Sequence, residues 1–179
     1  LLLRKDFSSK KQKEIFSEAL RVGHQSRHAW RPGDLESVTE FTLAFTQITD
    51  AGLKELTRLP NLTELSLENT KITDAGLKEV ARLKNLTVLN LAGTQITAVG
   101  LKEVAKLENL TSLDLGDTQI TDVGLKEVAK LKKLESLDFP IDQITDVGLK
   151  EVAKLKKLTS LRFNYSYRFF RTDAVLPNT

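Results

Sequence analysis

Residues 118–131 read TQITDVGLKEVAKL, and residues 142–155 read DQITDVGLKEVAKL, almost the same sequence 24 residues later. Three looser copies precede them: TQITDAGLKELTRL at 46–59, TKITDAGLKEVARL at 70–83 and TQITAVGLKEVAKL at 94–107. Self-similarity at a fixed period of this length is typical of a solenoid, in which one structural unit recurs along an axis. The repeat therefore decides the fold of most of the chain.

Each copy predicts one short strand and one helix. The copies align on Ile48, Ile72, Ile96, Ile120 and Ile144. Before the isoleucine, the three middle copies have an L-x-x-L-x-L pattern such as Leu110, Leu113 and Leu115, and the first and fifth have variants of it with Val or Phe. Its central part alternates with period two, which indicates a strand with one face toward a core. The GLKEVAKL segment after it has apolar residues at helical spacing. One such coil cannot bury its own apolar residues, but stacked neighbours can.

The pattern resembles the leucine-rich repeat family, in its Thr-containing bacterial variety and in the helix-bearing repeats of ribonuclease-inhibitor-like and F-box-associated proteins. The resemblance covers roughly residues 38–163. It implies an α/β fold, a right-handed horseshoe solenoid with parallel strands on the concave side and helices on the convex side. Many family members carry Asn where this chain has Thr46, Thr70, Thr94 and Thr118, with Asp142 in the last full copy. We expect these short side chains to bond the loop of the next coil and satisfy buried backbone groups.

A second set of repeated residues stands where each helix should begin. Thr49, Thr73, Thr97, Thr121 and Thr145 suit an N-cap, and Asp50, Asp74, Asp122 and Asp146 follow them. The helix dipole favours a carboxylate there, and Ala98 replaces the aspartate in one copy. We therefore predict that Thr is the cap and that Asp supplements it. The glycine of each copy should let adjacent helices approach closely.

The chain divides into three parts. Residues 1–37 are expected to form an N-terminal helical cap, with a helix at 8–22, and a connector. Residues 38–163 are the repeats, five full copies and the start of a sixth, and residues 164–179 are a degenerate C-terminal cap or tail. Aromatic residues including Phe163, Phe169 and Phe170 either plug the end of the core or form a loop that anchors a partner.

Composition excludes several classes of function. No stretch is long and apolar enough to span a membrane, so no membrane association is expected. There are no cysteines, which excludes disulfides and thiolate metal sites and fits a reducing compartment such as the cytoplasm. No signal peptide is visible, but the chain starts at Leu1 rather than Met, which is consistent with an upstream segment.

Candidate catalytic and metal sites are weak. His24 and His28 have an i, i+4 zinc spacing but lack a third ligand. Asp114 and Asp138 occupy equivalent strand positions and should stand about 5 Å apart, a separation known from retaining glycosidases. A solvent-open sheet offers no apolar pocket to raise the pKa of one carboxyl, so we expect neither catalysis, cofactor nor metal.

The concave strand positions differ between copies and are the expected binding site. They include Glu40, Glu64, Glu68, Val88, Asn90, Asp114, Asp138 and Arg162. Their carboxylates should form a strip about 20 Å long, because adjacent strands lie about 4.8 Å apart. Such a strip predicts a monomeric, non-catalytic module that binds a basic protein surface, with Val88, Phe45 or Ile141 in apolar contact.

Two alternatives remain at this stage. The lysines of the expected convex side are Lys126, Lys130, Lys132, Lys133, Lys150, Lys154, Lys156 and Lys157. They are either a solvated face or a nucleic-acid-binding surface, although no aromatic residues interleave with them. The repeats could also be a structural scaffold without a dedicated ligand.

Overall fold

The computed structural model describes residues 32–164, which wind into a stack of coils joined by one parallel sheet. The strands are β1 (Glu40–Thr42), β2 (Glu64–Ser66), β3 (Val88–Asn90), β4 (Ser112–Asp114), β5 (Ser136–Pro140) and β6 (Ser160–Asn164). They pair in sequence order, and paired residues such as Leu89 and Leu113 lie one 24-residue repeat apart. The 24-residue period of the sequence therefore equals the offset between paired residues of adjacent strands.

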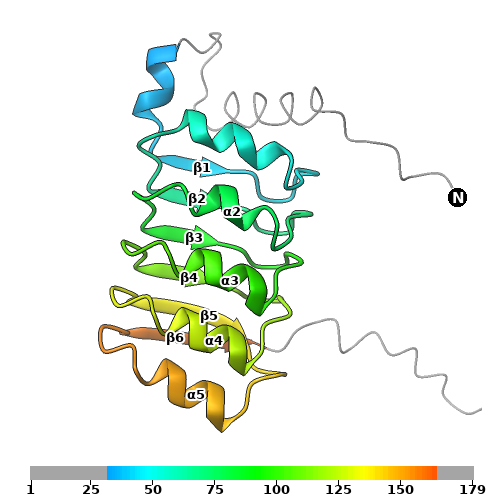
Figure 1. The fold of residues 1–179 in the computed structure, drawn as a ribbon, viewed down its shortest axis with the longest axis vertical. Helices are drawn as coiled ribbons and strands as arrows, with labels where there is room; N and C mark the ends of the chain where they lie inside the picture. Colours follow the sequence, from blue (N-terminus) through cyan, green and yellow to red (C-terminus); the bar gives the residue numbers. More distant parts are fainter. Residues whose placement is uncertain (1–31, 165–179) are drawn as a thin grey trace, which may run out of the picture.

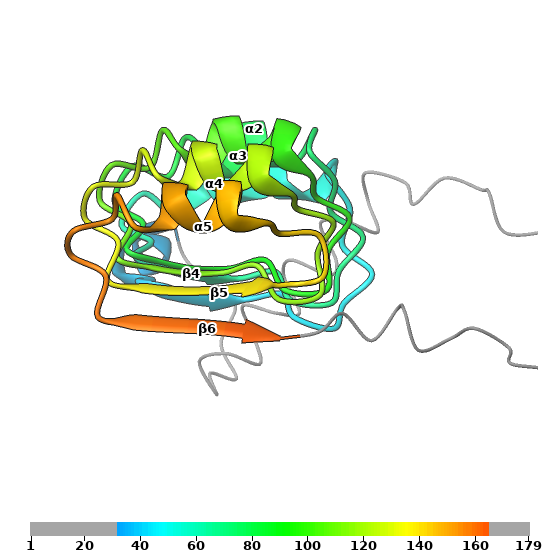
Figure 2. The same ribbon diagram turned by 90° about the horizontal axis from the view of Figure 1, so that it is seen from below.

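Helical segments form a second layer on one side of this sheet. They are the 3-10 helices η1 (Pro32–Ser37) and η2 (Gly52–Arg58) and the α-helices α2 (Leu77–Val80), α3 (Ala98–Val104), α4 (Asp122–Val128) and α5 (Asp146–Val152). Figures 1 and 2 show the two layers along and down the stack. We call the outer side of the sheet the strand face and the outer side of the helical layer the helix face. The α/β solenoid predicted from the repeat is confirmed.

The first full copy differs from the prediction, because η2 is a 3-10 helix rather than an α-helix. Thr57 occupies the position that is Ala81 in the next copy, and its hydroxyl donates to the carbonyl of Lys54 at 2.8 Å. Local hydroxyl bonds of this kind compete with the backbone hydrogen bonds of a helix. In the next copy the Ala81 N–H instead makes an α-type bond to the carbonyl of Leu77 at 2.9 Å.

The core lies between the two layers, and the inward strand residues fill it. Leu65, Leu89, Leu113 and Leu137 are each at most 2% exposed. The last described coil is different, since Leu161 is 42% exposed and Phe163 is 59% exposed. The Phe163 ring lies 6.4 Å from that of Phe139, which is fully buried. That the C-terminal aromatic residues plug the core stays a prediction, because Phe169 and Phe170 lie outside the described residues.

The threonines that replace the family's Asn bond their own coil rather than the next one, contrary to the prediction. The hydroxyls of Thr46, Thr70, Thr94 and Thr118 donate to the carbonyls of Leu43, Leu67, Leu91 and Leu115, three residues earlier, at 2.6–2.7 Å. A hydroxyl is short and reaches the turn that it belongs to. The buried carbonyl at the end of each strand is satisfied in this way.

Side-chain hydrogen bonds between coils come instead from three other columns of residues. Hydroxyls of Thr63, Thr87, Thr111 and Thr159 donate to the backbone carbonyl one repeat earlier. The amides of Asn61, Asn85 and Asn109 likewise donate to carbonyls of the preceding coil. The third column joins the aspartate of one coil to the threonine cap of the next, at Asp50–Thr73, Asp74–Thr97 and Asp122–Thr145.

The Asp–Thr junctions revise the predicted capping. Asp74 accepts the backbone N–H of Thr97 at 2.8 Å and its hydroxyl at 2.7 Å, while the Thr97 oxygen accepts the N–H of Val99 at 3.2 Å. Thr121, whose preceding coil carries Ala98, makes no side-chain cap hydrogen bond. The aspartate of one coil thus orients the cap of the next, and it is more than a supplement to its own helix.

The repeated glycine makes room for this carboxylate. A Cβ at Gly76, Gly100 or Gly148 would collide with Oδ1 of the aspartate in the preceding coil, and at Gly76 it would also lie 2.9 Å from Leu53 Cδ1. At Gly124, which follows the coil of Ala98, the nearest atom is Leu101 Cδ1 at 3.0 Å. The predicted close approach is therefore present, and where the preceding coil carries the aspartate, the carboxylate is nearer to the glycine than the leucine side chain is.

Part of the N-terminal region falls within the described residues. The connector ends in η1, and Leu35 of this segment is buried against the core. The expected helix at 8–22 and the histidines His24 and His28 lie outside the described residues.

Replacing Leu113 with alanine should destabilise the stack by roughly 2–5 kcal/mol, because the side chain is buried in a central strand. Stability passes between neighbouring coils, so hydrogen exchange should quicken in β3 and β5 as well as β4. Chemical denaturation measures the total loss. Ser112→Ala, on the outward side of the same strand, is the control and should change little; an equal loss in both variants would contradict the assigned register.

Ala98→Asp should stabilise the protein by about 1 kcal/mol, because it supplies the acceptor that Thr121 lacks and completes the capping of α4. Gly124 leaves space for the new carboxylate. The reciprocal variant Asp74→Ala removes an existing junction and should lower the melting temperature. If Ala98→Asp also lowers it, the Asp–Thr junction is not a stabilising contact.

Candidate functional site

The outward residues of the strands form rows across the strand face. One row runs Glu40, Glu64, Val88, Ser112, Ser136 and Ser160, and the next runs Thr42, Ser66, Asn90, Asp114, Asp138 and Arg162. The acidic residues fall at opposite ends of different rows. The single acidic strip that we expected is thus divided into an N-terminal acidic group (Glu40, Glu64 and Glu68) and a C-terminal acidic pair (Asp114 and Asp138).

The C-terminal acidic pair is held by hydrogen bonds. Oδ1 of Asp114 accepts the N–H of Gly116 at 2.9 Å, and Oδ1 of Asp138 accepts the amide of Asn164 at 3.3 Å. A Cβ at Gly116 would lie 2.9 Å from the same Asn164 amide, so the Asn164 side chain reaches back across β5. Arg162 follows Asp138 in the row. These contacts fix the orientation of both carboxylates.

Two effects raise the pKa of Asp138. Burial disfavours its charged form, and the neighbouring Asp114 carboxylate adds a like charge. Arg162 and the backbone N–H of Phe139 oppose the shift but do not cancel it. Asp122 in the scaffold behaves in the opposite way, since the hydroxyl and then the N–H of Thr145 hold its pKa below the usual range. Burial and the charge of Asp114 therefore destabilise the ionised form of Asp138.

The N-terminal acidic group includes one carboxylate that is also held in place. Oε1 of Glu68 accepts the amide of Asn69, and Oε2 accepts the amide of Asn90, both at 3.3 Å. Glu40 and Glu64 are exposed neighbours on β1 and β2. Of the apolar residues expected nearby, Val88 is half-buried and Ile141 is partly buried against the core, while Phe45 is 70% exposed.

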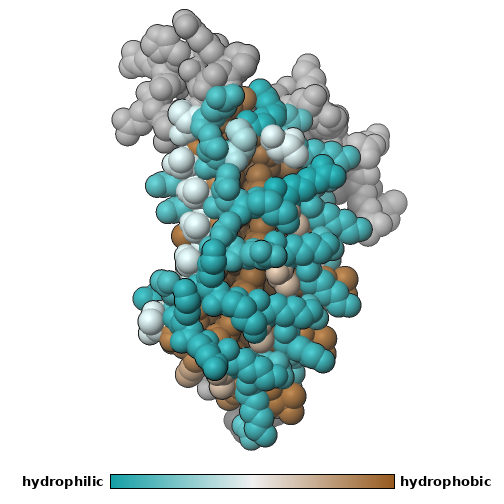
Figure 3. Space-filling view, turned by 60° about the vertical axis from the view of Figure 1, so that its left-hand side comes forward, coloured by the Kyte–Doolittle hydropathy of each residue, from teal (hydrophilic) through white to brown (hydrophobic). Residues whose placement is uncertain are grey.

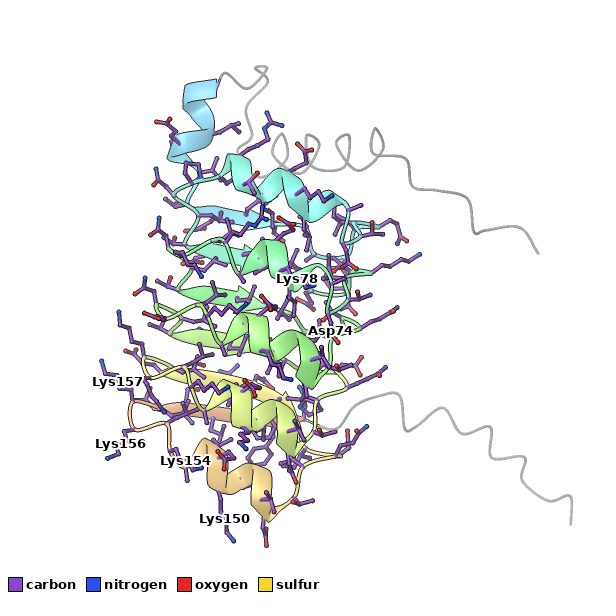
Figure 4. The ribbon with its side chains drawn as sticks, viewed as in Figure 1. Asp74, Lys78, Lys150, Lys154, Lys156 and Lys157 are labelled. Carbon is purple, nitrogen blue, oxygen red and sulfur yellow. The ribbon has the colours of Figure 1, made fainter. Side chains whose placement is uncertain are left out.

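The helix face has a different charge arrangement. Five of its basic residues form ion pairs with the glutamate three residues earlier, at Arg58–Glu55, Arg82–Glu79, Lys106–Glu103, Lys130–Glu127 and Lys154–Glu151. Lys150, Lys154, Lys156 and Lys157 extend from the C-terminal end of the stack (Figure 4). Figure 3 shows the edge where the strands begin as largely hydrophilic. Pairing with glutamate lowers the net positive charge of this side.

Residues 32–164 contain neither a candidate metal cluster nor a candidate membrane span. No cluster of three or more His, Cys, Asp or Glu in this range could hold a metal ion. No helix in the same range has the length and apolar character needed to cross a membrane.

The pH dependence of stability should show the strain at Asp138. Because its pKa is raised on folding, the folded protein binds more protons than the unfolded chain between the two pKa values, and stability falls as pH rises through that window. Asp138→Asn should therefore be more stable than the wild type near about pH 7 and equally stable near about pH 3. Urea denaturation at both pH values tests this. A less stable variant near neutrality would mean that attraction to Arg162 dominates.

Comparison with known proteins agrees with this geometry. The family model described as Leucine Rich repeats (2 copies) matches residues 84–127, and the model described as Leucine Rich repeat matches residues 58–81. Internalin C2 of Listeria monocytogenes is similar in structure, with a TM-score of 0.61 and 27% identity over 84% of this chain and 74% of that chain. Internalin F of the same organism has a TM-score of 0.51 and 21% identity over 83% of this chain and 55% of that chain. None of the curated protein sequences matches significantly. With matched repeats stacked as parallel strands and helices in one open sheet, the chain is a leucine-rich repeat protein.

Proposed function

We propose that this chain is a non-catalytic protein-interaction module that binds a basic protein surface on its strand face. The observation that carries the proposal is the unequal pairing of charge on the two sides. Five helix-face bases pair with the glutamate three residues earlier in the chain, whereas the five acidic residues of the strand face have Arg162 as the one base among the described strand-face positions. The strand face therefore presents negative charge to an approaching partner.

The electrostatics of the strand face also favours binding of a partner over catalysis. Like charges on adjacent strands repel, and a basic partner relieves this repulsion on binding. Asp114 and Asp138 lie on an open sheet whose carboxylates are already oriented by Gly116 and Asn164. Charge complementarity of this kind steers encounter and raises the association rate.

Nucleic-acid binding through the helix-face lysines is the weaker candidate. Lys130 and Lys154 are each within 2.6 Å of a glutamate oxygen, and Lys133 donates to Asn109 at 2.8 Å. Phosphate contacts would have to compete with these internal partners. The scaffold interpretation without a ligand predicts no partner at all and is tested by the same experiment.

The test is affinity capture from a native lysate followed by binding kinetics with the captured partner. Neutralising the strand face with Glu64→Gln, Asp114→Asn and Asp138→Asn should slow association about 10-fold or more at low salt and flatten its salt dependence. The variant should fold, since these residues lie on the outward side of their strands, and should keep the stability gain expected for Asp138→Asn.

The matched control removes the same charge away from the strands, with Glu36→Gln, Glu108→Gln and Asp146→Asn. This control should associate at a rate close to that of the wild type. Equal rates and salt slopes in the strand-face variant and the wild type would show that the acidic residues are only solvated surface.

A further inference from the structure

The backbone at Phe45 is unlike that of an ordinary aromatic residue. Phe45 has a φ of 59°, in the left-handed region that L-residues other than Asn, Asp and Gly seldom adopt. The equivalent positions in the next three coils are Asn69, Gly93 and Asp117, with φ of 50°, 67° and 49°. Four successive coils have a left-handed residue at this position, and three of them use residue types suited to it.

Packing does not explain the phenylalanine. Its side chain is 70% exposed, so it contributes little to the core. Its backbone is held in place, because the Phe45 N–H donates to the carbonyl of Glu68 at 2.8 Å, as the Asn69 N–H does to Ala92 one coil later. The chain thus presents a large apolar ring to solvent from a rigid and locally unfavourable backbone position.

The residue bonded to Phe45 carries the oriented carboxylate of the N-terminal acidic group. Glu68 is held by the amides of Asn69 and Asn90, each bonded to a different oxygen at 3.3 Å. Each carboxylate oxygen has two lone pairs, so both can still accept a second donor. An aromatic ring and a preoriented carboxylate therefore lie on adjacent coils at the edge of the strand face.

We propose that Phe45 and Glu68 form an anchor site for an arginine side chain of the basic partner. A guanidinium group can donate two parallel hydrogen bonds to a carboxylate and can stack its plane on an aromatic ring. A lysine ammonium supplies a point charge without the fork or the flat face. Glu40 and Glu64, in the same acidic group, add long-range attraction for the cation.

This inference rests on the proposed function, and it can be tested without the partner. The probe is N-acetyl-arginine amide. It is titrated against the whole 179-residue chain while the chemical shifts of the backbone amides are recorded by NMR. We expect weak binding, with a Kd of about millimolar or higher, and shifts centred on Phe45, Glu68, Asn69 and Asn90. N-acetyl-citrulline amide has nearly the same shape without the charge and should produce no such shifts, and N-acetyl-lysine amide should bind more weakly.

Substitutions separate the anchor from the rest of the face. Phe45→Asn should weaken arginine binding about 2- to 5-fold, the usual contribution of a cation over an exposed ring. Glu68→Gln should weaken it at least as much, because the charge-assisted hydrogen bonds are lost. Glu108→Gln, an exposed position away from the strands, is the matched control and should leave arginine binding unchanged.

Phe45→Asn provides a second readout that does not depend on binding. Asparagine suits the left-handed conformation and already occupies it at Asn69, so the variant should melt at a higher temperature than the wild type. A lower melting temperature would show that Phe45 serves the fold and would overturn the inference. Shifts confined to Asp114 and Asp138 would also overturn it while leaving the proposed function intact, and so would the absence of any arginine-specific shift. Failure of the proposed function itself would appear separately, in the capture experiment.

Discussion

The coils at residues 32–164 depend on one constraint imposed by stacking: each coil must bond the next at the same offset, one repeat along the chain. The backbone ladder from β1 to β6 imposes this offset, and the columns headed by Thr63, Asn61 and Asp50 reinforce it. A coil cannot bury its leucines alone, so a loss of register at one junction would expose apolar surface on both sides. The copies are nearly identical because each coil has to meet this same geometric requirement.

How far the sequence predicts the structure follows from this constraint. Strands, core residues and register depend only on the period and on apolar spacing, and they agree with prediction at Leu89 and Leu113. The hydrogen-bond partners of the side chains could not be predicted from the spacing of residues in the sequence. From the sequence alone, the Asp74 carboxylate could cap its own helix or accept hydrogen bonds from the next coil. The outcome depends on the space left by Gly100, which is seen only in the structure. The one available signal was the coincidence of Asp with Gly in the copies.

The candidate site was predicted in composition but not in arrangement. The outward positions of the strands were identified correctly, yet the acidic residues were expected to form one strip. The register places Glu64 and Asp114 in different rows, with Val88 and Asn90 between the two acidic groups. Phe45 could be seen only as an apolar neighbour, because a left-handed backbone at a phenylalanine has no local sequence signature comparable to glycine. Its unusual conformation required the structure.

The two faces solve opposite electrostatic problems. On the helix face, a glutamate and a base three residues apart meet, as in Glu103 and Lys106 at 2.7 Å, so part of the positive charge is neutralised within the coil. On the strand face, neighbours in a row come from different coils, and a recurrent carboxylate meets its own copy, as at Asp114 and Asp138. The Asp114 carboxylate has a local role, since it accepts the Gly116 N–H, but burial and then the like charge of Asp114 raise the pKa of Asp138. Under the proposed function, a cation supplied by the partner would relieve this repulsion.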